Sequence, residues 1–195
     1  MTAFEFKIAW SEYDGELRPI SLETLLRFNL SNETREFLNT SGLPDEAAPF
    51  LSFVGDINLK NKYDSINILT NWFDFLPTEY SKYVVIGTDG SGDVIALNTE
   101  EGGVIEWLDH EDGFSSRFMN SSILHLASCL IAYNQFIKVI RKENGDDAYI
   151  EANFNDTQFE NLYKSQKSTD EYSLNKGNFW QTDLDSLIAQ RDNNI

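Results

Sequence analysis

Short apolar segments alternate with polar turns along much of the chain, and the clearest example covers residues 83–108. Mostly apolar runs in this region are separated by turns rich in glycine and acidic residues. Glycine accepts the left-handed backbone that tight turns need, and aspartate bonds to the backbone of its own turn. The pattern therefore predicts antiparallel strands joined by hairpin turns. These strands are expected at 83–86, 94–97 and 104–108.

The third of these strands alternates between apolar and charged side chains. Ile105 and Trp107 share one face of the strand, and Glu106 points to the other. We therefore expect Ile105 and Trp107 to lie in the core and the Glu106 carboxylate to lie in water.

A long helix is predicted after the strands, with Asn120 or Ser121 as its N-cap and its end near Lys142. Its apolar residues cover most of the helix circumference, which is typical of a helix at the centre of a core. The uncharged run 118–137 has the length of a membrane span, but it contains asparagine, serine, histidine and glutamine side chains that are costly in hydrocarbon. A buried helix is therefore predicted in place of a membrane span.

The remaining pattern is weaker and predicts elements of both kinds. A helix that follows Ser31 or Asn32 is expected to end at Gly42, because glycine is favoured just after a helix and Pro44 prevents its continuation. Together the elements predict an α+β fold, with a central mostly antiparallel sheet flanked by helices, in one domain spanning 1–195 with a helical C-terminal part at 146–195. The other predicted elements are strands at 4–10, 49–54 and 66–72, helices after Ser21, at 157–164 and at 181–190, and a loop at 165–176.

Acidic residues concentrate in the same region as the predicted strands. The chain carries a formal net charge of −17, and residues 83–116 contain eight carboxylates and no lysine or arginine. Such a surface opposes nucleic acid and anionic lipid and favours a basic protein partner, although acidity can also serve solubility alone. The candidate partner-binding residues are Glu106, Asp109, Glu111, Asp112, Glu100, Glu101, Asp89 and Asp93.

Motifs for catalysis or metal binding are weak in this sequence. His125 and Cys129 are spaced to share a helix face, but no third ligand is evident, so a buried pair is favoured over a metal site. The glycine-rich run 87–92 lacks a lysine and leads into a strand, unlike a phosphate-binding loop. No cofactor is predicted. An acid–base hydrolase stays open as a third possibility, because 32 acidic residues allow many carboxylate pairs.

Several short motifs, in their order, resemble the SUKH superfamily and most closely its fourth branch. The resemblance is best over 42–142, although Asn98 stands where an aspartate is common and Leu126 where an aromatic residue is frequent. The motifs are Gly42-Leu43-Pro44; Ile86-Gly87 with Asp89-Gly90 and Gly92-Asp93; Gly103-Val104 with Leu108-Asp109-His110; Phe118 to Ser122; and Phe179-Trp180.

The resemblance implies a SUKH-like α+β fold and a binding role without catalysis. It implies a bacterial immunity protein that binds and neutralises a cognate toxin, often one that acts on nucleic acid; a regulatory protein-binding scaffold is the alternative. The single cysteine and the absence of a signal-peptide pattern lead us to expect a cytoplasmic protein. The motif glycines are expected to form turns, and Asn120 and Ser121 to cap the long helix.

Overall fold

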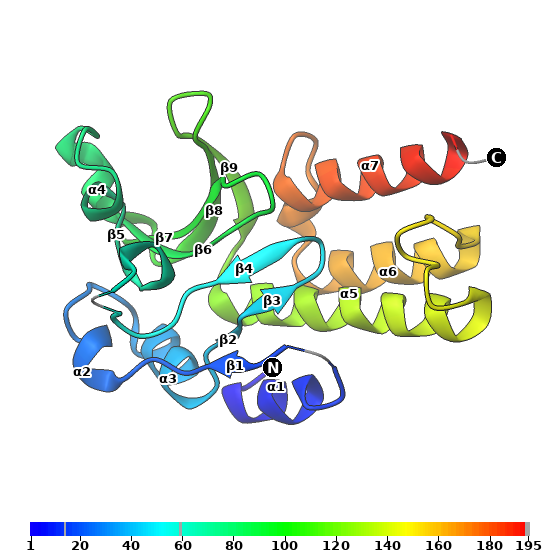
Figure 1. Ribbon diagram of the computed structural model, residues 1–195, viewed down its shortest axis with the longest axis horizontal. Coiled ribbons are helices and arrows are strands. Elements are labelled where there is room, and N and C mark those ends of the chain that lie inside the picture. The colour runs from blue at the N-terminus through cyan, green and yellow to red at the C-terminus, as the bar shows by residue number, and fades with distance from the viewer. Residues whose placement is uncertain (14, 59, 194–195) are drawn as a thin grey trace.

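An antiparallel sheet forms the centre of the computed structural model, which describes residues 1–13, 15–58 and 60–193 (Figure 1). Within these residues the strand order is β3-β4-β6-β7-β8-β9, and β5 also pairs with β6. A short pair, β1 (Leu17–Arg18) and β2 (Leu43–Pro44), forms a separate two-stranded sheet that contacts β4. The sheet strands are β3 (Glu46–Ala47), β4 (Leu51–Phe53), β5 (Asn67–Ile68), β6 (Tyr83–Thr88), β7 (Val94–Asn98), β8 (Val104–Asp109) and β9 (Ser115–Asn120).

Helices flank this sheet, so the predicted α+β arrangement is confirmed (Figure 1). The longest, α5, contacts α1, α3, α6, β8 and β9. It is long and apolar enough to cross a membrane by composition, but it buries residues such as Leu126, Leu130 and Tyr133 in the core, as predicted. The helices are α1 (Ala3–Trp10), α2 (Leu22–Leu25), α3 (Asn32–Thr40), α4 (Leu69–Trp72), α5 (Ile123–Asn144), α6 (Asp156–Thr169) and α7 (Phe179–Asn193).

The predicted strands at 83–86, 94–97 and 104–108 are confirmed as β6, β7 and β8, which pair antiparallel in sequence order. A fourth neighbour, β9, was not predicted. Its first half is exposed and polar, so its sequence shows no strand alternation. Its pairing with β8 is therefore a tertiary contact that local pattern does not reveal.

The predicted strand at 4–10 is wrong, because this segment is helix α1. Thr2 caps the helix by accepting a hydrogen bond from the Glu5 amide, and the Glu5 carboxylate accepts one from the Thr2 amide in return. Phe6 and Trp10, four residues apart, are both buried on one helix face. The capping pair was visible in the sequence, and the loose alternation of apolar residues was misleading.

Two other predictions were partly wrong. The segment 66–72 holds only the short β5 before it turns into α4, and much of the predicted loop at 165–176 continues α6 or forms the 3₁₀ helix η4 (Glu171–Leu174). The helix caps were predicted better, since Ser31 caps α3 and Gly42 follows it with a φ of +66°. A side chain at Gly42 would collide with the Arg18 carbonyl, so the position requires glycine.

The cap of α5 is Ser122, and not Asn120 or Ser121. These two residues instead bind the C-terminal part of the chain. The Trp180 indole donates to the Asn120 Oδ1 at 2.9 Å, and both the Ser121 amide (2.7 Å) and hydroxyl (2.9 Å) donate to the Asp170 carboxylate. All of this network except Ser121 is buried. It fixes η4 and α7 against β9.

Candidate partner-binding surface

The eight acidic candidates fall into three classes of exposure. Asp93 and Glu106 are buried, Asp89 and Asp109 are partly buried, and the others are exposed. The exposed residues are Glu100, Glu101, Glu111 and Asp112.

Glu106 lies in the interior, so the expectation that its carboxylate faces water is wrong. It accepts hydrogen bonds from the Tyr83 hydroxyl at 2.9 Å and from the Asn98 amide at 2.8 Å. Tyr80 and Phe114 cover this face of the sheet through ring contacts that continue to Tyr83. Alternation along a strand shows which side chains share a face, but it does not show whether the second face is open. Burial and the Glu106 carboxylate raise the pKa of Tyr83 well above its usual range.

The two aspartates of the β6–β7 turn are engaged in building it. The Asp89 carboxylate accepts hydrogen bonds from the Ser91 and Asp93 amides, and also from the Trp107 indole at 2.8 Å. Asp93 accepts from the His110 amide at 2.9 Å and contacts the His110 Nδ1 at 2.6 Å. That hydrogen bond raises the pKa of His110. These contacts hold the β6–β7 turn against the start of the β8–β9 turn.

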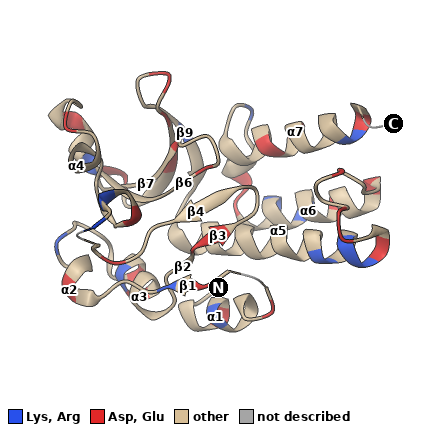
Figure 2. Cartoon of the chain, in the orientation of Figure 1, with Lys and Arg blue, Asp and Glu red and all other residues tan. Residues whose placement is uncertain are grey.

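The four exposed carboxylates lie at opposite ends of β8. Glu100 and Glu101 belong to the 3₁₀ helix η3 (Thr99–Glu101) before β8, and Glu111 and Asp112 belong to the turn after it. Five residue steps along β8 separate the two ends by about 17 Å. In Figure 2 acidic residues mark the tip of the turn between β8 and β9. The carboxylates therefore form two groups, and the second group also includes Asp109.

A cluster of aromatic side chains adjoins the β8–β9 turn. The ring centroids of Phe73 and Phe114 are 5.0 Å apart, and Phe75 lies 5.9 Å from Phe73. The Tyr80 hydroxyl donates to the Gly113 carbonyl of the turn at 2.9 Å. Phe75 is 72% exposed, although it contacts two other rings. We call the side chains Tyr63, Phe73, Phe75, Tyr80 and Phe114 the aromatic cluster.

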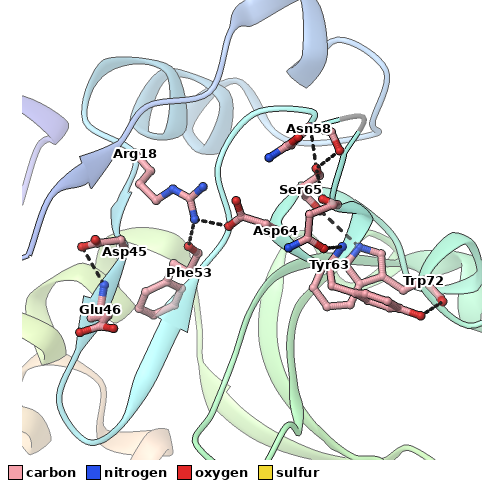
Figure 3. A network of polar contacts seen from close by, with 10 residues as sticks. Arg18, Asp45, Glu46, Phe53, Asn58, Tyr63, Asp64, Ser65 and Trp72 are labelled. Carbon is pink, nitrogen blue, oxygen red and sulfur yellow. Dashed lines mark hydrogen bonds and ion pairs between the residues drawn. The ribbon is translucent and has the colours of Figure 1, made fainter.

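Tyr63, at the edge of this cluster, is positioned by a polar network around the loop that precedes β5 (Figure 3). The Arg18 guanidinium of β1 donates to the Phe53 carbonyl at 3.0 Å and pairs with the Asp64 carboxylate at 2.5 Å. The hydrogen bond from Arg18 holds the pKa of Asp64 below its usual value. Tyr63 directly precedes Asp64 in the chain, and its ring meets the Trp72 ring edge-on with 5.4 Å between the centroids. The ring itself is 52% exposed.

Acidic side chains border the aromatic cluster. Asp74 stands between Phe73 and Phe75 in sequence and is exposed, and Glu79 is exposed in η2 (Thr78–Lys82), whose Tyr80 belongs to the cluster. At the other edge of the cluster, the Lys62 ammonium lies 4.9 Å from the centroid of the Tyr63 ring. We define the acid–aromatic surface as the aromatic cluster together with Asp74, Glu79, Glu111 and Asp112.

The sequence reading missed the aromatic half of this surface. The predicted strand at 66–72 ended at Trp72 and residues 73–75 were assigned to no element, although three aromatic residues in the four positions 72–75 were a visible signal. Exposed aromatic residues surrounded by polar side chains are typical of protein interaction sites.

His125 and Cys129 make separate contacts. The His125 Nδ1 lies 3.0 Å from the Ser122 hydroxyl, while the Asn120 amide contacts the Cys129 sulfur at 3.5 Å. Burial raises the pKa of the Cys129 thiol to about 12, so it stays protonated at neutral pH. Across the described residues, no three histidine, cysteine or acidic side chains come together in a way that could hold a metal.

Comparison with known proteins places the chain in a family. The family model described as SUKH-4 immunity protein matches residues 15–186. No curated protein and no solved structure matches the chain. The matched range includes the meander of β6 to β9, the acid–aromatic surface, α5 and the first half of α7, so the resemblance found in the sequence is confirmed. The chain therefore belongs to the SUKH-4 family of immunity proteins.

Proposed function

We propose that this immunity protein neutralises its cognate toxin by binding it through the acid–aromatic surface. The observation that carries the proposal is Phe75, which is 72% exposed within a cluster of rings bordered by carboxylates. Aromatic side chains at the centre of an interface contribute most of its binding free energy, whereas a polar border excludes water and sets orientation. Phe75 is therefore the central anchor, and Glu111 and Asp112 form the acidic border.

The charge of the surface supports a basic partner. A toxin that acts on nucleic acid must bind phosphates, so its substrate groove carries lysine and arginine. Carboxylates on the immunity protein compete for those cations and attract the toxin over a distance, which raises the association rate at low salt. The partner in this proposal is a basic, nucleic-acid-targeting toxin encoded beside the gene of this chain, and binding occurs in the cytoplasm.

The aromatic part of the proposal is tested by Phe75→Ala. Phe4 of α1 is exposed to 66%, lies outside the acid–aromatic surface, and supplies the matched control Phe4→Ala. We expect Phe75→Ala to weaken binding of the neighbouring gene's toxin by tenfold or more, mainly through faster dissociation. Phe4→Ala is expected to bind as the unaltered protein does, and equal binding by both variants would contradict the proposal.

The acidic part is tested by reversing charge at one end of β8 and then at the other. Glu111→Lys with Asp112→Lys alters the proposed surface, whereas Glu100→Lys with Glu101→Lys makes the same charge change about 17 Å away. We expect the first pair to slow association more strongly and to remove more of its salt dependence. Equal effects from the two pairs would show that only net charge matters.

A further inference from the structure

A cleft opens on the other face of β8, between α7 and the β3–β4 and β6–β7 turns. Its volume is about 590 Å³, and it continues into a smaller hollow of about 250 Å³ beside Tyr133 and Tyr149. In Figure 1 both turns lie near the N-terminal end of α7. Trp107 lines the cleft, and Glu106, next to it in β8, points to the face that carries the aromatic cluster. The cleft is therefore separate from the acid–aromatic surface.

Asp183 of α7 lies where the cleft and the smaller hollow meet. Its carboxylate accepts a hydrogen bond from the Tyr133 hydroxyl at 2.8 Å. Among residues 1–13, 15–58 and 60–193, no lysine, arginine or histidine forms an ion pair with it. Burial raises the pKa of Asp183 to about 7. When the carboxylate is ionised, it lacks a counter-ion among the described residues.

The fold does not require a carboxylate at this position. An asparagine would accept the same hydrogen bond from Tyr133 and would carry no charge to desolvate. An acidic group held in a cleft at a free-energy cost is typical of a binding position, where a ligand supplies the missing charge.

The walls of the cleft favour a cation as that ligand. The ring centroids of Trp107 and Phe179 lie 6.4 Å apart with their planes tilted by 42°, and Phe50, which also lines the cleft, is 67% exposed. Arg117, which also lines the cleft, places its guanidinium 5.0 Å from the Trp107 ring, so this ring already makes one cation–π contact. Asp89, also in the lining, is bonded to the Trp107 indole.

The backbone of Phe50, which lines the cleft, is strained. Its φ is +59°, a left-handed conformation that an aromatic residue rarely adopts. In this conformation the Phe50 ring is exposed, and its centroid lies 6.4 Å from that of the Tyr149 ring. Phe50 lines both the cleft and the smaller hollow. Backbone strain of this kind gathers at sites where side-chain placement matters for binding.

We propose that this cleft binds an arginine or lysine side chain presented by a protein partner, with Asp183 as the counter-ion and with Phe50, Trp107 and Phe179 as its walls. A buried charge-assisted hydrogen bond between aromatic faces makes such a side chain an anchor of the interface. The inference rests on the proposed function in one respect only, namely that the partner is the toxin. The cleft itself is tested without any toxin.

The test uses L-argininamide as the probe and the Trp107 indole N–H signal of the ¹⁵N-labelled full chain as the readout. We expect saturable shifts at Trp107 and at the residues of α7 that line the cleft. Citrullinamide has almost the same shape and the same α-amino group but a neutral ureido group in place of the guanidinium, and it is expected to cause no such shifts. Shifts of equal size with both probes, or shifts spread over the acidic residues outside the cleft, would overturn the proposal.

Two substitutions on the same helix give the matched comparison. Asp183→Asn removes the counter-ion and is expected to weaken argininamide binding by tenfold or more, while its melting temperature does not fall. Asp185→Asn makes the same charge change at an exposed position that pairs with Gln181, and it is expected to bind normally. Equal affinity of Asp183→Asn and Asp185→Asn would refute the role of Asp183.

The pH dependence gives an independent readout. The groups that face or line the site with Asp183 are Tyr133, Tyr149, Asp89 and Arg117, and burial raises the pKa of both tyrosines, so they stay neutral. With the pKa of Asp183 near 7, binding of argininamide is expected to be about tenfold weaker at pH 6 than at pH 8. A flat profile would contradict the proposal.

A peptide with one central arginine separates a partner's side chain from a free small cation. Binding of the peptide at least as tightly as argininamide supports a protein partner. Exclusion of the peptide while argininamide binds would show that the cleft admits only free cations, and the proposed occupant would then be wrong.

Discussion

Tyr83 donates a hydrogen bond to Glu106 across the meander, and both side chains are buried, at 5% and 7% exposure. Tyr83 starts β6 and Glu106 lies in β8, with Asn98 of the intervening β7 bonded to the same carboxylate. The three strands are therefore joined by side chains as well as by their backbones. This polar link occupies the position that the sequence had suggested for a water-exposed acid.

The link predicts a difference between two substitutions at Glu106. Glu106→Gln retains an oxygen for Tyr83 but presents an NH2 group to the Asn98 amide, so only one of the two donors keeps its acceptor and the loss is expected to be smaller than that of Glu106→Ala. Glu106→Ala leaves the buried Tyr83 hydroxyl and the Asn98 amide unpaired and is expected to cost about 2–4 kcal/mol. Urea unfolding measures both. Equal loss in the two variants would show that charge, and not hydrogen bonding, holds Glu106 in place.

Leu130 tests whether α5 is central to the core. Its side chain is 1% exposed, so Leu130→Asp buries an unpaired charge and is expected to unfold the protein or lower its stability by more than about 4 kcal/mol. Gln135→Asp introduces the same side chain at an exposed position of the same helix and is expected to have a small effect. Thermal unfolding followed by circular dichroism makes the comparison.

The ion pair of Arg18 and Asp64 predicts an effect of acid. Because the pKa of Asp64 is lowered in the folded state, its contribution to stability is present above the unfolded pKa and is lost as pH falls through the folded pKa. The Arg18→Met variant lacks this contribution, so its unfolding is expected to show a weaker dependence on pH below about 4. The chemical shifts of Tyr63, followed by NMR, are expected to change with it, because the pair fixes the loop that carries this ring.

The opposite sign is expected for Asp183. Its pKa in the folded state is raised to about 7, so folding favours the protonated carboxyl group. The contribution of this group to folding stability is complete below its unfolded pKa and is lost as pH rises through 7. Above pH 7 the ionised carboxylate is a net cost, and Asp183→Asn is expected to be more stable than the unaltered protein by at most about 4 kcal/mol. Urea unfolding at pH 4.5 and pH 8 measures the difference. An Asp183→Asn variant that is less stable at pH 8 would contradict the burial of an unpaired charge.

The sequence predicted best where structure is determined locally. The three strands of the meander follow from glycine turns and apolar runs, and α5 follows from its apolar circumference. The cap at Ser31 and the end at Gly42 depend on a few neighbouring residues and were also correct. The family resemblance rested on these same residues, which explains why it was confirmed.

The features that the sequence did not predict depend mostly on contacts between separate segments. Glu106 was misplaced because Tyr80, which precedes β6, and Phe114, in the turn after β8, cover its face of the sheet. Asn120 and Ser121 were read as helix caps, whereas their partners Asp170 and Trp180 lie about fifty and sixty residues later. The acid–aromatic surface and the Asp183 cleft likewise join separate segments. Neither could be assembled from sequence spacing alone.

The network of Asn120, Asp170 and Trp180 also has a consequence for the order of folding during synthesis. The strand that supplies Asn120 emerges from the ribosome long before Trp180, whose indole fills the Asn120 acceptor. A nascent chain that stops before Asp170 leaves the Ser121 amide and hydroxyl and the Asn120 Oδ1 without these partners. The meander is thus completed early, and the native state is reached only when the last helix arrives.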